Sequence, residues 1–128
     1  MDCSDLLEEA SRGGLIYMPK ERKFVSPSLQ TAVLKFGIKR VQAELTTARI
    51  RSMVNATRTN YSNIKRICDT TQDPGYCYMA ESILPQLERM LEEFEHSIRS
   101  AKPLMIYGID ENDNVGGLLL EIRRPDDY

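Results

Sequence analysis

Apolar residues recur every three or four positions through two long parts of the chain, which is the spacing of one helix face. The first part begins at Ser26-Pro27, a capping hydroxyl followed by proline at the first helical position, and no further proline occurs for about 40 residues. The second follows a Pro-Gly turn at residues 71–75 and extends over residues 78–101, where Pro85 either kinks it or marks its start. The pattern predicts a long antiparallel helical hairpin over residues 26–101.

Short apolar runs on either side of this hairpin indicate small β elements. Residues 15–18 and 24–25 lie close enough to form a short N-terminal hairpin, after a first helix at residues 4–11 that Ser4 can cap. Residues 104–109 and 118–122 are separated by a loop rich in Asp, Asn and Gly, which is typical of a β-hairpin.

The expected fold class is therefore mainly α with minor β (α+β). We expect one domain over residues 1–128, because a chain of this length can bury a core of its own. Residues 1–25 form its N-terminal helix and strand segment, residues 26–101 a coiled-coil-like helical hairpin, and residues 102–128 a small C-terminal β-hairpin with a polar tail.

The apolar face of the first long helix changes direction along its length. Its two halves keep the alternating four- and three-residue spacing of a coiled-coil seam, but their faces differ by about half a turn. Either the helix breaks near residues 49–55, or its halves pack against different partners, one of them another subunit; we prefer the second, which also explains the length. The seam residues are Leu34, Ile38, Val41 and Leu45 in the first half and Ile50, Val54, Tyr61 and Ile64 in the second.

The second helix is amphipathic in a simpler way. One face carries the residues expected in a core, and a separate stripe is acidic. The core residues are Leu84, Leu87, Met90, Leu91, Phe94 and Ile98, and the acidic stripe consists of Glu81, Glu88, Glu92 and Glu95.

The net charge of −2 conceals a strong internal polarity. Residues 18–67 hold eleven basic and two acidic side chains, a local charge of +9, and the remainder carries −11. Arg40, Arg51, Arg58 and Lys65 fall on one line of the first helix, about 37 Å long, which suits the phosphates of duplex RNA or DNA. The alternatives are a solvated face or pairing with the acidic helix.

Few residues suit catalysis or metal binding. Cys3, Cys68 and Cys77 are expected to be free thiols in a reducing compartment, although the last two flank one turn. His96 is the only histidine and lies one helical turn from Glu92, which is typical of a surface pair. We predict no enzyme activity, no catalytic residue, no metal site and no cofactor.

These observations favour an interaction or assembly protein that acts through self-association and helix-mediated protein binding. The expected partners are a second copy of the chain and another protein, with duplex nucleic acid as the alternative. An acidic N-terminus and the lack of a long apolar run predict an intracellular protein, cytoplasmic or nuclear, with no membrane partner.

Overall fold

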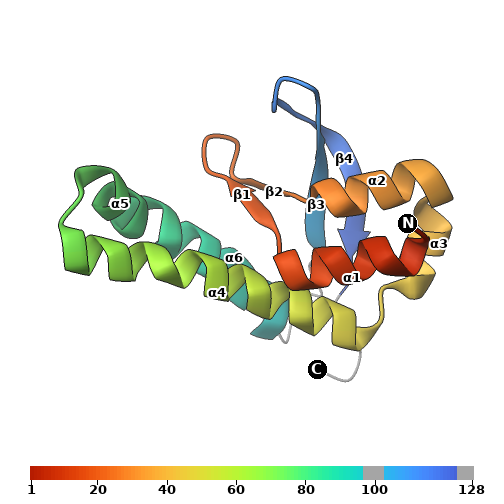
Figure 1. Cartoon of the computed structure of the whole chain (residues 1–128), viewed down its shortest axis with the longest axis horizontal. Coiled ribbons are helices and arrows are strands. Elements are labelled where there is room, and N and C mark those ends of the chain that lie inside the picture. The colour runs from red at the N-terminus through yellow and green to blue at the C-terminus, as the bar shows by residue number, and fades with distance from the viewer. Residues whose placement is uncertain (97–102, 124–128) are drawn as a thin grey trace.

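The computed structural model describes residues 1–96 and 103–123, so Ile98, the predicted helix end at residues 97–101 and the tail at residues 124–128 lie outside the described residues. The fold is mainly helical with a small sheet, as the α+β prediction requires (Figure 1). The elements in chain order are α1 (Cys3–Gly13), β1 (Ile16–Met18), β2 (Lys23–Val25), α2 (Pro27–Phe36), α3 (Ile38–Glu44), α4 (Thr47–Thr71), α5 (Pro74–Tyr78), the π-helical turn η1 (Met79–Ile83), α6 (Leu84–His96), β3 (Leu104–Ile109) and β4 (Val115–Ile122).

The first helix, α1, begins at Cys3, one residue before the predicted range of 4–11. Asp2, not Ser4, is its N-cap, and the Asp2 and Asp5 carboxylates each accept a hydrogen bond from the other residue's backbone N–H. Ser4 has another partner, because its hydroxyl accepts a 2.7 Å bond from the Arg49 guanidinium. The capping box satisfies helix N–H groups that would otherwise lack partners.

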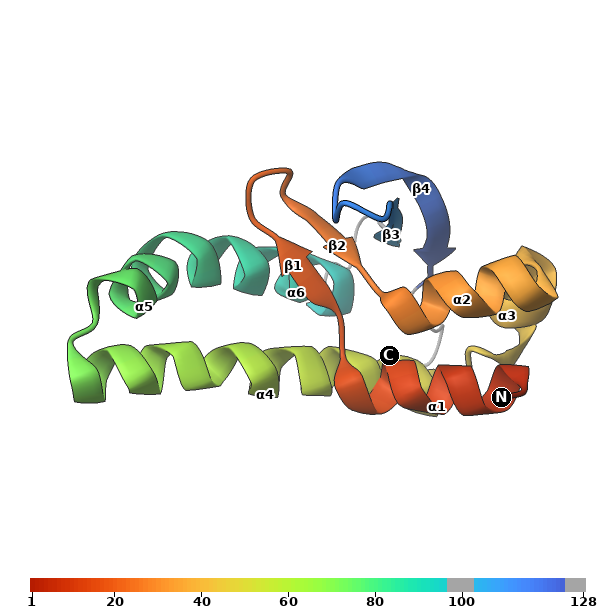
Figure 2. The ribbon, with the colours of Figure 1, turned by 45° about the horizontal axis from the view of Figure 1, so that its top comes forward.

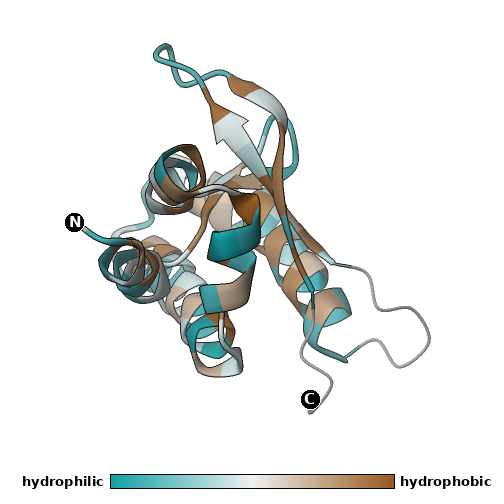
Figure 3. Ribbon diagram, turned by 90° about the vertical axis from the view of Figure 1, so that its right-hand side faces the viewer, coloured by the Kyte–Doolittle hydropathy of each residue, from teal (hydrophilic) through white to brown (hydrophobic). Residues whose placement is uncertain are grey.

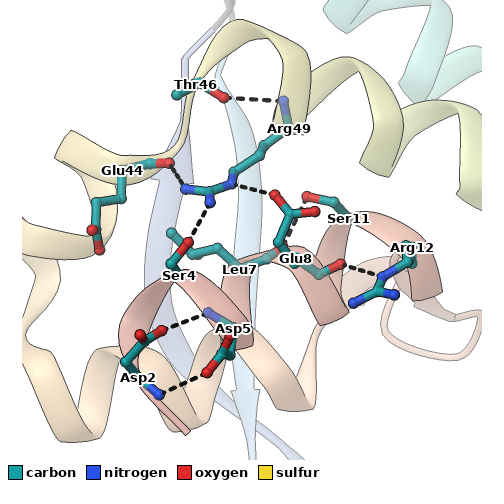
Figure 4. A network of polar contacts seen from close by, with 10 residues as sticks. All are labelled: Asp2, Ser4, Asp5, Leu7, Glu8, Ser11, Arg12, Glu44, Thr46 and Arg49. Carbon is teal, nitrogen blue, oxygen red and sulfur yellow. Dashed lines mark hydrogen bonds and ion pairs between the residues drawn. The ribbon is translucent and has the colours of Figure 1, made fainter.

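Arg49 joins α1 to the start of α4 (Figure 4). Its guanidinium donates to the Glu8 carboxylate at 3.0 Å and to the Glu44 carbonyl at 2.7 Å, in addition to Ser4. These charge-assisted bonds hold α1, the end of α3 and α4 in one arrangement.

The predicted single helix from residue 26 is wrong, because the chain forms three helices there. Ser26 caps α2 as predicted, with its hydroxyl accepting from Leu29 N–H, but α2 ends at Gly37, whose φ of 88° is outside the helical range. A second break follows α3, where Thr46 caps α4 by accepting from Arg49 N–H. The breaks therefore precede residues 49–55, and a continuous coiled-coil seam does not form.

The long helix α4 is continuous through residues 55–63, where three of its polar side chains bind the chain segment at residues 13–17. Thr57 Oγ1 accepts a 2.8 Å bond from Leu15 N–H, and the Tyr61 hydroxyl accepts one of the same length from Tyr17 N–H. Asn60 donates to the Gly13 carbonyl at 2.7 Å. These residues therefore serve tertiary contacts and do not mark a turn.

After α4 the chain reverses and returns beside it as α5, η1 and α6 (Figures 1 and 2). A disulfide between Cys68 and Cys77 joins α4 to α5, which corrects the expectation of free thiols. The π-helical turn η1 comes directly before Pro85, and Leu84 N–H bonds five residues back to the Met79 carbonyl. Proline disturbs the helical turn that precedes it, and a wider turn accommodates that disturbance.

The two predicted β-hairpins combine into one sheet of order β1-β2-β3-β4. Each hairpin is antiparallel, and β2 joins β3 in parallel with Phe24 opposite Ile106 and Val25 opposite Tyr107. Helices cover one face of the sheet, and the β3–β4 tip extends beyond them (Figures 1 and 3). The core is thus the space between this face and the helices, where Tyr17 also donates to the Gln86 side chain at 3.0 Å.

Candidate interaction surface on the outer face of the sheet

The two faces of the sheet follow from the alternation of side chains along each strand. One face belongs to the hydrophobic core, and its residues occupy matched positions in neighbouring strands. They are Tyr17, Phe24, Leu104, Ile106, Leu120 and Ile122. The residues between them point to the other side, which we call the outer face: Ile16, Met18, Lys23, Val25, Met105, Tyr107, Leu118 and Glu121.

A row of four residues crosses all the strands of the outer face. Ile16 lies opposite Val25, Val25 opposite Tyr107, and Tyr107 opposite Leu118. Ile16 is 45% exposed and Leu118 is 50% exposed, and the neighbouring Met105 is 40% exposed. Leu118 and Met105 lie near each other beside Tyr107, whereas Ile16 lies beyond the buried Val25. Exposed apolar side chains that lie close together are typical of an interaction surface, whereas scattered ones are not.

The outer face is hollowed beside the middle of this row. A shallow pocket of about 280 Å³ is lined by Ile16, Met18, Val25, Ile109 and Asp113. Val25 forms its floor, since that side chain is only 1% exposed. The lining of this depression is mostly apolar, with Asp113 as its one charged residue.

The aromatic residue of the row, Tyr107, is in contact with the ammonium group of Lys23. Lys23 Nζ lies 4.3 Å from the centroid of the Tyr107 ring, within the range of a cation–π interaction. The contact fixes the ring against β2 and leaves a positive charge at the margin of the apolar row.

The free end of the β3–β4 hairpin is held by side chains that replace strand partners. Gln30 of α2 donates to the Ile109 carbonyl at 2.8 Å and accepts from Ile109 N–H at 2.9 Å. In the loop, the Asp110 carboxylate accepts from the backbone N–H groups of Asn112 and Asn114, and these bonds lower the pKa of Asp110. The tip of the hairpin is therefore anchored to α2 and by hydrogen bonds within its own loop.

The seam residues predicted from the sequence fall into a buried group and an exposed group in the structure. Val41, Ile50, Val54 and Ile64 are buried, and Leu45 and Tyr61 are partly buried against the core. These residues pack within the chain itself. Leu34 and Ile38, on either side of Gly37, are instead exposed by 77% and 46% and contribute no shared face with the others.

The basic line predicted on one helix is also divided. Arg40 lies on α3 and forms an ion pair of 3.7 Å with Glu44, whereas Arg51, Arg58 and Lys65 lie on α4. Arg58 pairs with Glu95 and, at 3.8 Å, with Glu92 of α6. Part of the basic charge thus meets the acidic helix, one of the alternatives left open by the sequence.

The cysteines and the histidine that the structure describes show no arrangement typical of a catalytic site. Burial, with the neighbouring Glu44 carboxylate, raises the pKa of the Cys3 thiol to about 11, which makes it a poor nucleophile at neutral pH. His96 lies on the surface of α6, 3.9 Å from Glu92 as the helical spacing predicts. Cys68 and Cys77 are joined to each other.

The outer face was missed in the sequence, although a signal for it exists. Ile16-Tyr17-Met18 and Met105-Ile106-Tyr107 are apolar at every position, whereas a strand with one solvated face alternates apolar and polar residues. A continuous apolar run in a short strand indicates that both faces are suited to burial.

Comparison with known proteins gives no relative. No family model, no curated protein and no solved structure matches the chain. Among residues 1–96 and 103–123, every helix is too short or too polar to cross a membrane.

Proposed function

We propose that this chain is a non-enzymatic interaction and assembly protein whose contact surface is the outer face of the sheet together with its β4 end. The observation that supports this function is the apolar row Ile16–Val25–Tyr107–Leu118, which ends in exposed side chains on both sides. The first partner we propose is a second copy of the chain.

The contact surface differs from the helical seam expected from the sequence. Most seam residues are used in the chain's own core, so they are not available to a partner. Burying Leu118 and its neighbours would instead remove apolar area from water at about 25 cal/mol per Å², the usual driving term of association.

Sedimentation velocity at several concentrations tests the proposal. We expect concentration-dependent association of the wild-type chain and at least about tenfold weaker association for Leu118→Asp, because the variant buries a carboxylate in an apolar contact. Leu34→Asp is the matched control: it changes a more exposed leucine on α2, away from the outer face, and should associate like wild type. A chain that remains monomeric, or equal effects of the two variants, contradicts the proposal.

Binding to duplex nucleic acid is the second candidate, and the structure gives it less support. It is supported by exposed basic side chains on α4, among them Arg51 and Lys65. Arg58 of the same helix forms ion pairs with acidic residues of α6. A gel shift with duplex RNA at low and high salt decides it, because phosphate contacts weaken steeply as salt rises. A salt-sensitive shift that is lost in Arg51→Glu would favour this candidate.

A further inference from the structure

The two edge strands of the sheet, β1 and β4, differ in whether their outer edges are covered. At the β1 end, α4 covers the strand, because Thr57 and Tyr61 accept the outward N–H groups of Leu15 and Tyr17. At the other end, β4 has a strand neighbour on one side only among the described residues. Gly116, Gly117 and Leu118 of β4 are exposed.

The composition of β4 suits pairing of its open edge with a strand of another chain. It is the longest strand, with eight residues, and Glu121 is its only charged residue. Proteins usually protect an open edge with lysine, proline or a very short strand, because a free edge offers unpaired N–H and C=O groups to another chain. β4 contains neither lysine nor proline.

We propose that two copies of the chain pair β4 with β4, antiparallel about a two-fold axis at Leu118, so that their sheets become one. This inference rests on the proposed function and names its geometry. An interface of this kind is isologous, with the same surface used by both copies.

Leu118 is the centre of the pairing because it is the exposed residue at which the apolar row ends on β4. An axis at Glu121 would instead place two carboxylates together, which is unfavourable. In the selected register the other opposed residues are Gly117 with Leu119, Gly116 with Leu120, and Val115 with Glu121.

The same register continues the apolar row of the outer face. Leu118 is the last residue of the row Ile16–Val25–Tyr107–Leu118, and the pairing places it against Leu118 of the second copy. The exposed half of each Leu118 side chain would then be covered by its equivalent. The row would extend across both sheets without interruption.

The paired sheet would be closed at both ends. Its outer strands would be the two copies of β1, each covered by α4, so the assembly stops at two. A cleft of about 290 Å³ beside Glu121, Ile122 and Arg123, lined also by Gln42 and Leu45, leaves space for the second copy's loop.

Cysteine cross-linking of the full chain tests the register. Leu118→Cys should give a disulfide-linked dimer under mild oxidation, because the two Cα atoms come within the roughly 4.4–6.8 Å that a disulfide spans. A mixture of Val115→Cys and Glu121→Cys chains should give the mixed dimer. A mixture of Val115→Cys and Arg123→Cys chains is the control: a shift of two residues separates the cysteines by more than about 7 Å and should prevent the bond.

The native cysteines do not interfere, since Cys3 is buried and Cys68 is bonded to Cys77.

The results separate the inference from the proposed function. Association without cross-links at Leu118, or with efficient Val115–Arg123 cross-links, overturns the β4 register and leaves self-association intact. A monomer at every concentration overturns both. Cross-links at Leu118 and in the Val115–Glu121 mixture, with none in the control, support both.

Discussion

Gly14 is required at its position by its backbone conformation and by a close contact with α4. Gly14 ends α1 with a φ of 75° and a ψ of −172°, a conformation that residues with a Cβ adopt at a cost of about 1–3 kcal/mol. A Cβ at this position would lie 2.8 Å from the backbone nitrogen of Thr57. Gly14 therefore permits the close approach of residues 13–17 to α4.

Replacing this glycine should be costly, and its neighbour offers a matched control. Gly14→Ala is expected to lower the free energy of unfolding by about 2–3 kcal/mol or more, since strain and the clash with Thr57 add together. Gly13→Ala meets nothing within 4 Å and should change the stability by less than about 1 kcal/mol. Urea unfolding measures both, and equal effects would contradict the assigned role.

Cys3 gives the fold a dependence on alkaline pH. Its thiol has a pKa of about 11 in the folded chain, raised by burial and by Glu44, against 9.0 without these influences. Between these values the unfolded chain loses a proton that the folded chain keeps, so stability falls as pH rises.

The expected loss attributable to Cys3 is on the order of 1–3 kcal/mol between pH 9 and pH 11. Cys3→Ser removes the thiol with little change in size and should flatten the stability profile over this interval. Urea unfolding of both chains at a series of pH values provides the test, and parallel profiles would contradict the assignment.

At the scale of elements, the sequence was most informative where one local signal acts alone. The start of α2 at Ser26-Pro27, the core face of α6 and both β-hairpins were predicted, because capping, helical periodicity and turn composition depend on neighbours in the chain. The breaks around α3 were missed because a single Gly37 and a Thr46 cap are weak signals within a periodic pattern.

Contacts between distant segments could not be predicted in this way. Nothing local shows that β2 adds to β3, and this parallel pairing is what creates the outer face and its apolar row. Likewise, Thr57, Asn60 and Tyr61 of α4 form hydrogen bonds with partners 42 to 47 residues away, which no local pattern indicates.

The disulfide between α4 and α5 connects two helices through residues that are nine positions apart, at one end of the molecule. Replacing Cys68 and Cys77 by Ser is expected to lower the stability by about 2–3 kcal/mol, the value for closing a loop of this size. Amide exchange should quicken in α5 and the end of α4 but not in the sheet. Unchanged thermal unfolding after reduction would contradict this role.

At the scale of the whole molecule, the fold separates its charged and apolar surfaces. The acidic side chains of α6 meet Arg58 within the chain, so part of the internal charge polarity is neutralised locally. The outer face and the β4 edge remain as apolar surface at the other side of the sheet. We therefore propose the sheet as the contact surface of the chain, although helices make up most of the fold.

Amide hydrogen exchange of the intact chain, measured in dilute and concentrated solution, tests this proposal most directly. We expect slower exchange across residues 115–122 in the concentrated solution, with no change in α5, because new backbone hydrogen bonds form only along β4. Association that leaves exchange in β4 unchanged, or that protects α4 instead, would contradict it.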